Sequence, residues 1–205
     1  MISHFDSDHS GKTIEIMENL NVKRLIISKQ PEYSEQFENT IKSSNKYKVE
    51  IIQVKAGDCI KIEDDIYFEI LWPKTEEMIT ENPLNNNSIV CKLNYNNFTM
   101  MFTGDIEEIA ENKIVAEYNL EELNSTILKV AHHGSVTSST EKFINKVNPK
   151  IALIGVGKDN KFGHPHDKII KMLEFKGINI FRTDLDGEII LIVDKNGKIK
   201  IETHL

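Results

Sequence analysis

Four side chains that commonly bind metal ions lie within six residues near the start of the chain, in the sequence SHFDSDH at residues 3–9. Imidazole nitrogen and carboxylate oxygen together suit zinc, manganese or iron. In an extended loop His4, Asp6 and Asp8 would point to one side, and His9 would join them at the start of a helix. The alternative interpretation is a polar turn that only caps the next helix.

Two later segments place the same kinds of side chain after predicted strands. Asp105 follows an apolar strand and precedes a predicted helix, where a helix-capping aspartate is the more common interpretation for this residue alone. His132 and His133 follow another apolar strand and precede Gly134, a residue that lets the backbone approach a ligand closely. For this pair alone, a metal site and a surface turn are equally good interpretations.

A fourth segment, Gly163-His164-Pro165-His166, again lies between a predicted strand and a predicted helix. Six of the seven histidines of the chain therefore fall into three short clusters at such junctions, which random scattering rarely produces. The seventh, His204, lies in the C-terminal tail. We interpret the clusters together as parts of one metal-dependent site.

The elements that would position these residues alternate between strands and helices along the chain, which indicates a mixed α/β fold with helices outside two sheets. Two of the strands, 88–95 and 98–102, form a predicted hairpin around Asn96-Asn97. The other predicted strands are 22–28, 49–54, 66–71, 127–131, 151–156, 178–181, 188–193 and 198–203, and the predicted helices are 32–44, 106–118 and 167–175.

Length and composition limit the classes of protein that remain. The 205 residues suit a single domain over residues 1–205, and the formal net charge of −7 argues against a nucleic-acid binder that works through global charge. No apolar run is long enough to span a membrane and the first residues do not resemble a signal peptide, so we expect a soluble, cytoplasmic protein. Cys59 and Cys91 show no metal-ligand spacing and are expected in buried or half-buried strand positions.

The metal-binding segment at residues 4–9 resembles the metal motif of the metallo-β-lactamase superfamily, in the variant that has aspartate as its third residue. The order of the later segments resembles the C-terminal hydrolase domain of competence DNA-uptake channel proteins and their stand-alone relatives. The resemblance covers nearly the whole chain and implies a four-layer αββα sandwich. Its later segments are NSIV at 87–90, TGD at 103–105, KVAHHGS at 129–135, GHPH at 163–166 and RTDLDG at 182–187.

The resemblance implies two divalent metal ions, zinc or manganese. His4 and Asp6 would bind the first ion. Many members of the superfamily bind this ion with a further histidine, at about the position where this chain has Asn87-Ser88. Asp8 and His9 would bind the second ion, and Asp105 would bridge the two. One histidine of the pair completes the second site, His132 in preference to His133. The residues expected to take part directly in catalysis are Asp8, Asp105 and His164, the last binding or protonating a phosphate at the mouth of the site.

These features favour a two-metal phosphodiesterase or nuclease-like hydrolase, with a phosphodiester or other small molecule as substrate and nucleic acid as an open alternative. A hydrolase of a small lactone, thioester or lactam is the second hypothesis. The third is a metal-binding domain without catalytic activity, because the family's domain begins with strands upstream of a motif that starts here at residue 4. An N-terminally truncated sandwich would expose a sheet edge, which a partner or a second copy of the chain would cover.

Overall fold

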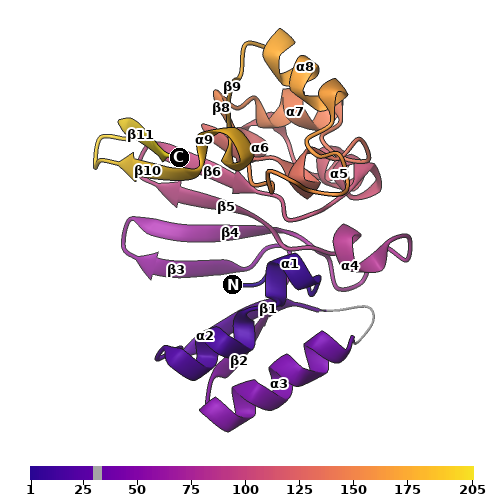
Figure 1. Ribbon diagram of the computed structural model, residues 1–205, viewed down its shortest axis with the longest axis vertical. Helices are drawn as coiled ribbons and strands as arrows, with labels where there is room; N and C mark the ends of the chain where they lie inside the picture. The colour runs from indigo at the N-terminus through magenta and orange to yellow at the C-terminus, as the bar shows by residue number, and fades with distance from the viewer. Residues whose placement is uncertain (30–33) are drawn as a thin grey trace.

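A seven-stranded mixed sheet forms the centre of the computed structural model, which describes residues 1–29 and 34–205 (Figure 1). The spatial order of the strands is β3-β4-β5-β6-β7-β8-β9. Neighbours are antiparallel from β3 to β6 and parallel from β6 to β9. The strand bounds are β3 Cys59–Glu63, β4 Ile66–Trp72, β5 Val90–Tyr95, β6 Phe98–Phe102, β7 Ile127–Lys129, β8 Ile151–Ile154 and β9 Asn179–Arg182.

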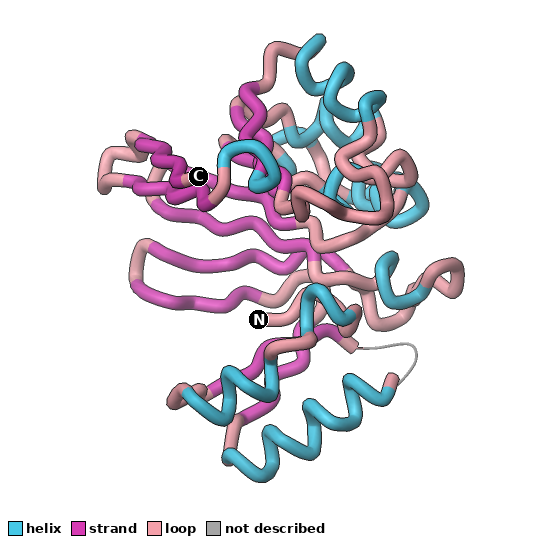
Figure 2. The backbone as a smooth tube through the Cα atoms, viewed as in Figure 1, coloured by secondary structure: helices cyan, strands magenta, loops and turns pink. Residues whose placement is uncertain are grey.

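Helices cover one face of this sheet, as Figure 2 shows at the top of the molecule. Their apolar side chains, among them Ile114 and Phe143, pack with Trp72 and Met101 from the strands into the largest buried cluster. The parallel strands β7 and β8 have no exposed residue, in keeping with their short sequences, which are apolar except for Lys129. The helices of this layer are α5 Glu108–Glu117, α6 Leu120–Leu123, α7 Glu141–Val147 and α8 Asp167–Phe175.

Two small sheets cover the opposite face of the central sheet and form a second β layer. The parallel pair β1 (Arg24–Ser28) and β2 (Glu50–Val54) packs on β3 to β5, with Ile26 and Ile52 facing Phe68. The antiparallel pair β10 (Glu188–Val193) and β11 (Ile199–His204) packs on β6 to β8.

Two helices, α2 (Thr13–Asn19) and α3 (Glu35–Tyr47), cover the outer face of β1 and β2. The layers are therefore helix, sheet, sheet and helix, which confirms the predicted αββα fold. The remaining helices are short and lie at loops: α1 Ser7–Ser10, α4 Pro83–Asn86, the 3₁₀ turn η1 Ala131–Gly134 and α9 Thr183–Asp186.

The second β layer is open between its two halves. Within the described residues β1 is hydrogen-bonded to no strand except β2, and across its other edge the backbone N–H of Ile2 donates to the carbonyl oxygen of Ile26. A cavity of about 600 Å³ lies beside this edge. Apolar side chains line most of the cavity, among them Ile60, Phe68 and Phe102.

Several elements differ from the sequence-based predictions. Strand β3 and helices α4 and α7 were not predicted, and the first two residues of the predicted helix 32–44 lie outside the described residues. The expectation that both cysteines are at least half-buried is wrong for Cys59, which is exposed on the edge strand β3, while Cys91 is buried. An edge strand has one neighbour only, so its side chains have less covering them.

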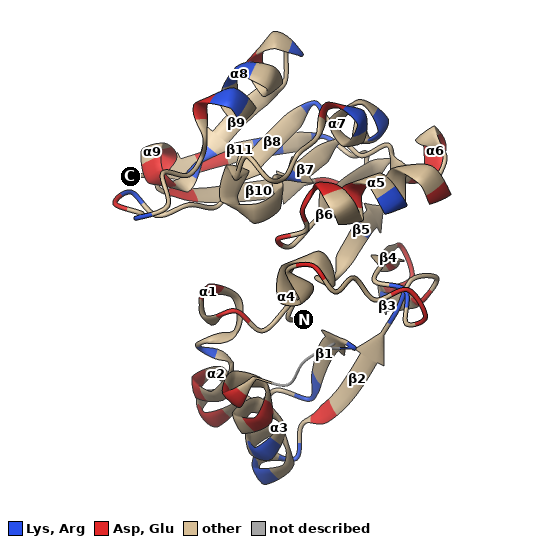
Figure 3. Ribbon diagram, turned by 90° about the vertical axis from the view of Figure 1, so that its right-hand side faces the viewer, with Lys and Arg blue, Asp and Glu red and all other residues tan. Residues whose placement is uncertain are grey.

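Acidic and basic residues are interspersed over the helices in Figure 3. Among the described residues no helix combines the length and the apolar character that crossing a membrane requires.

Candidate metal centre

Buried apolar side chains hold the loop that carries the first metal-binding segment in place. Ile2 and Phe5 are buried in the core under α2 and α3, and the His4 side chain between them is 0% exposed. Asp6 precedes α1, and its side chain makes no capping hydrogen bond. Helix α2 begins after Lys12, also without a side-chain cap. The capping interpretation of this segment is therefore wrong, and its acidic side chains are free to face the centre.

Asp105 lies in the loop between β6 and α5, and its backbone N–H donates to the hydroxyl of Ser88. Gly104 before it has φ 52°, and a Cβ at this position would lie 2.6 Å from the Cβ of Ser88. Only glycine therefore lets the loop pass so close to Ser88. Helix α5 has Glu107 as its N-cap residue, so the capping interpretation is wrong for Asp105 as well.

His132 and His133 both have left-handed backbone conformations, with φ of 48° and 53°. Such conformations cost a non-glycine residue about 1–3 kcal/mol and occur mainly where function requires them. Gly134 follows with φ 83°, and a Cβ there would lie 2.6 Å from the Cβ of Pro165. The strained turn directs the two histidine rings to different neighbours.

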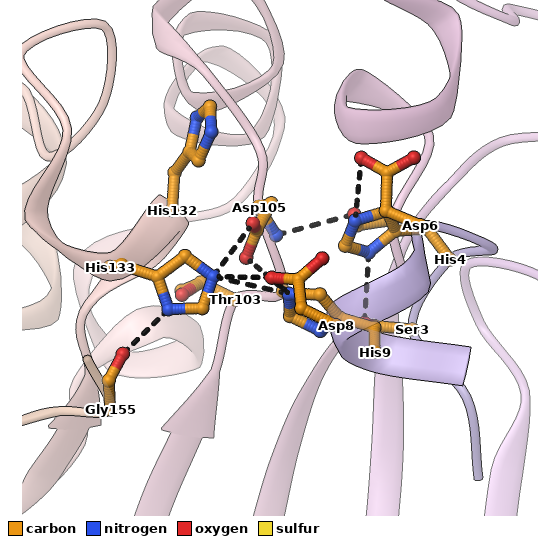
Figure 4. Close-up of polar contacts among 12 residues, drawn as sticks. Ser3, His4, Asp6, Asp8, His9, Thr103, Asp105, His132, His133 and Gly155 are labelled. Atoms are coloured by element: carbon orange, nitrogen blue, oxygen red, sulfur yellow. Dashed lines mark hydrogen bonds and ion pairs between the residues drawn. The ribbon is translucent and has the colours of Figure 1, made fainter. Parts of the chain in front are cut away.

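The His133 ring points into the centre, towards the first segment and Asp105 (Figure 4). Its Nδ1 donates to the carbonyl oxygen of Gly155 at 2.6 Å, which leaves Nε2 free to act as a ligand. Nε2 lies 3.1 Å from Asp8 Oδ2, 3.3 Å from Asp105 Oδ2 and 3.4 Å from His9 Nε2. One ligand atom from each of Asp8, His9, Asp105 and His133 falls within 4.8 Å of the others.

The His132 ring lies outside this group of four. Its Nδ1 is 3.7 Å from a carboxylate oxygen of Glu107 and 3.5 Å from the hydroxyl of Thr137. The geometry thus favours His133 over His132, whereas the resemblance gave preference to His132.

His4 and Asp6 lie beside the four converging residues and form a second, looser group. His4 Nε2 is 3.6 Å from Asp6 Oδ2. His4 Nε2 is buried and has no hydrogen-bond partner among the described residues. Asp105 Oδ1 is also buried, and it lies 3.2 Å from His9 Nε2 and 3.6 Å from the Lys129 ammonium. Because a buried polar atom without a partner is costly, His4 Nε2 suits a cation.

Ser3 orients both histidines of the first segment. Its hydroxyl lies 3.0 Å from His4 Nδ1 and 3.3 Å from His9 Nδ1, so both rings turn their Nε2 atoms towards the centre. Histidine ligands in metal sites commonly have such a partner on the other ring nitrogen.

Charges within the centre shift the pKa values of several of these groups. Burial alone would raise the pKa of Asp105, but contacts with His133, His9 and Lys129 hold it far below the usual range. The same contact with Asp105 raises the pKa of His133. Burial, together with the neighbouring His9, lowers the pKa of His4 to about 4. His4 is therefore neutral at neutral pH, as a metal ligand must be.

Lys129 supplies a cation beside the centre. Its ammonium lies 3.6 Å from Asp105 Oδ1 and 3.3 Å from the carbonyl oxygen of Gly104. Burial lowers the pKa of this lysine, and the negative charge of Asp105 opposes that effect.

A cavity of about 560 Å³ opens from the centre to the surface, with Asp6, Asp8, Asp105 and His133 in its wall. His164 also lines this cavity, and its ring centroid is 5.6 Å from that of His132. Burial and the neighbouring histidines lower the pKa of His164. The position matches the mouth of the site, where the sequence analysis expects His164.

Sequence reasoning missed Ser3, Lys129 and Gly155 as supports of the centre. Ser3 is next to His4 in the sequence, and Lys129 lies in the segment that carries His132 and His133. This closeness in sequence to the candidate ligands could have identified both residues. Gly155 acts through its backbone carbonyl oxygen, which no residue type reveals.

Comparison with known sequences identifies relatives among competence proteins, while no family model matches the chain. The chain is 32% identical to ComE operon protein 3 of Bacillus subtilis over 92% of its length, and 28% identical to competence protein ComA of Neisseria gonorrhoeae over 96%. It spans 24% and 25% of these two relatives, about a quarter of their length.

Among solved structures, the CmlA β-hydroxylase E377D mutant superimposes with a TM-score of 0.54 at 8% identity, covering 88% of this chain and 42% of CmlA. A likeness at this identity concerns the fold alone, and that fold is the metallo-β-lactamase fold. The chain is thus a homologue of the competence proteins ComE operon protein 3 and ComA, and it has the metallo-β-lactamase fold.

Proposed function

We propose that the chain is a metal-dependent hydrolase that cleaves phosphodiester bonds. One observation carries the proposal: two carboxylates and two imidazoles from three separate segments bring their ligand atoms within 4.8 Å of one another. Three of the four residues, Asp8, Asp105 and His133, line an open cavity. The two carboxylates of this cluster repel each other when both are ionised, and a divalent cation would neutralise that repulsion.

The first ion in this proposal would be held by Asp8, His9, Asp105 and His133. His4 and Asp6 would hold a second ion, with Asp105 as a shared ligand. His132 stays outside both positions. Aspartate oxygen in both sites suits hard divalent ions, and zinc and manganese are the two candidates.

Divalent ions bound here would supply positive charge to a phosphate and activate a water molecule as the nucleophile. The chain itself fixes the positions of the ligands, through Ser3 for His4 and His9 and through Gly155 for His133. His164 lines the same cavity and can donate a hydrogen bond to a phosphate oxygen.

A phosphodiester substrate is favoured over a lactone, thioester or lactam by the relatives and by the charge of the centre. One of the relatives is named as a competence protein, and the competence homologues suggest a function related to DNA, a phosphodiester polymer. Without metal ions the carboxylate ligands offset the positive charge of the residues around them. Recognition of a negatively charged phosphate would therefore depend on the bound metal. The fold alone does not decide the reaction, since CmlA is a β-hydroxylase.

We further propose that residues 1–205 act as one hydrolase domain. The edge of β1 away from β2 is contacted by Ile2 through one backbone hydrogen bond, and this edge and the apolar cavity of about 600 Å³ beside it suit an additional covering strand. A partner or a second copy of the chain could supply that strand, and the oligomeric state in solution would distinguish the two.

The test is hydrolysis of bis(p-nitrophenyl) phosphate by purified protein, first stripped of metal with a chelator and then titrated with manganese or zinc. The proposal expects turnover that is absent after chelation and returns with metal. Metal bound to the stripped protein without any turnover would overturn the phosphodiesterase proposal while leaving the metal centre in place.

A further inference from the structure

Phe162 lies at the rim of the active-site cavity with 82% of its surface exposed. It belongs to the loop between β8 and α8, the same loop that supplies His164 and the Gly155 carbonyl oxygen. A single exposed apolar residue is ordinary on a protein surface. Phe162 differs because its loop is ordered by hydrogen bonds and its ring continues a row of rings from the metal centre.

Asn160 holds the loop in place. Its side-chain oxygen accepts hydrogen bonds from the backbone N–H groups of Phe162 and His164, at 3.2 and 2.9 Å. Its side-chain nitrogen donates to the carbonyl oxygens of Gly157 and His164. The backbone that carries the exposed ring is thus fixed on both sides, which limits the entropy lost when a ligand packs on the ring.

The rings of His133, His164 and Phe162 are nearly parallel to their neighbours. His133 and His164 are inclined by 17° with centroids 6.4 Å apart, and His164 and Phe162 by 27° with centroids 5.9 Å apart. The row begins at a residue of the metal centre and ends at an aromatic face open to solvent. A flat group attached to a phosphate in the centre could pack on that face.

We propose that Phe162 is a stacking residue that holds an unpaired nucleobase adjacent to the phosphodiester bond in the cavity. The inference rests on the proposed phosphodiesterase function and adds a substrate feature to it. Bases in a duplex are stacked on each other, so only an unpaired base offers its face. Lys158 and Lys161 are exposed in the same loop and can contact flanking phosphates, with Asp159 offsetting part of their charge.

The experiment compares two single-stranded oligodeoxynucleotides of equal length, one of thymidylate residues and one in which the residues are abasic. Binding is measured by anisotropy of a labelled oligonucleotide, and cleavage by gel, both with manganese present. Stacking of one base corresponds to roughly a 5- to 150-fold change in affinity. We expect the wild-type chain to prefer the thymidylate oligonucleotide by roughly tenfold or more.

Phe162→Ala should reduce this preference to near 1, and Phe162→Trp should keep it. Phe175→Ala is the matched control, because Phe175 is 92% exposed at the end of α8 and does not line the cavity. An unchanged preference in Phe162→Ala, an equal loss in Phe175→Ala, or no preference in the wild-type chain would overturn the proposal.

The two proposals fail separately. Metal-dependent hydrolysis of bis(p-nitrophenyl) phosphate without any base preference would remove the role of Phe162 and leave the phosphodiesterase. A base preference in binding that depends on Phe162, without cleavage of any phosphodiester, would keep the stacking residue and overturn the phosphodiesterase.

Discussion

The two halves of the candidate metal centre differ in how completely the chain builds them. On one side, Asp8, His9, Asp105 and His133 converge within 4.8 Å. On the other side, His4 and Asp6 have a contact of 3.6 Å, and Asp6 remains 43% exposed in its side chain. Where related motifs place a further histidine, this chain has Asn87 and Ser88, whose side chains serve other partners.

Under the proposed function, the difference predicts two metal positions of unequal affinity that share Asp105. Asp8, His9, Asp105 and His133 would supply four ligands to the first of them, the number that zinc prefers. The His4 side has a buried imidazole whose Nε2 atom has no hydrogen-bond partner among the described residues and one partly exposed carboxylate, so it would need water or substrate to complete a coordination shell. A substrate phosphate would then be drawn to the less complete side.

The variant with the largest expected effect is Asp105→Ala, because Asp105 belongs to both halves. Removing it should abolish metal-dependent turnover, a fall of roughly a thousandfold or more, and should lower the affinity at both positions. Circular dichroism should show a folded chain. Asp64→Ala, in the exposed turn between β3 and β4, is the control. Turnover close to wild type in Asp105→Ala would contradict the shared role.

The second variant pair separates the adjacent histidines. His133→Ala should lose the tightly bound ion and turnover by roughly a hundredfold or more, because one of four ligands is removed. His132→Ala should keep the ion, since its ring faces Glu107 and Thr137 instead. Metal content after dialysis is the measurement. The reverse result, with the ion lost only in His132→Ala, would assign the site to the other ring.

The third comparison sets His9→Ala against His4→Ala. The first should weaken the tight position, and the second should weaken only the loose one, so that one ion per chain remains bound in His4→Ala. Calorimetric titration with manganese would separate the two steps. Equal loss of both ions in the two variants would show that the halves do not differ.

The smallest effect concerns pH. Asp105 raises the pKa of His133, so the metal-free chain holds a proton on His133 that an incoming ion must displace. Metal affinity should therefore fall by roughly tenfold per pH unit below that pKa and level off above it. The stability of the metal-free chain should depend on pH in the opposite direction from metal affinity. The stabilising contact of protonated His133 is fully present below the pKa that His133 has in the unfolded chain, and it is lost as pH rises through the raised pKa of His133 in the folded chain.

A pH titration of metal affinity in His133→Ala is the control for this effect, because the proton on His133 is then absent. The same slope in the wild type and in the variant would place the proton on another group.

The sequence predicted much of the fold because several elements carry strong local patterns. The hairpin β5–β6 has period-two alternation around Asn96, whose φ of 50° suits the turn, and α8 has the predicted bounds. Helix α7 was missed because it has only seven residues, although Thr140 before it accepts a hydrogen bond from the Phe143 N–H as a helix cap. The edge strand β3 was missed because most of its side chains are exposed and show no apolar pattern.

The site was predictable as a set of segments but not in its detail. The spacing of histidines and aspartates identifies residues that come together, because each cluster follows a strand or precedes a helix. It does not tell which of His132 and His133 turns inward, because both adopt left-handed backbone and the choice depends on the Gly155 carbonyl oxygen of a distant strand end. Tertiary contacts of this kind leave no mark in the local sequence.

The most direct test of the metal centre is a count of bound ions per chain. Metal-free protein would be titrated with zinc and, separately, manganese, with bound ions counted by native mass spectrometry. The account predicts one tightly bound ion, followed by a second that binds more weakly, and loss of both in Asp105→Ala. A wild-type chain that binds no divalent ion, or binds as many as Asp105→Ala with the same affinity, would contradict it.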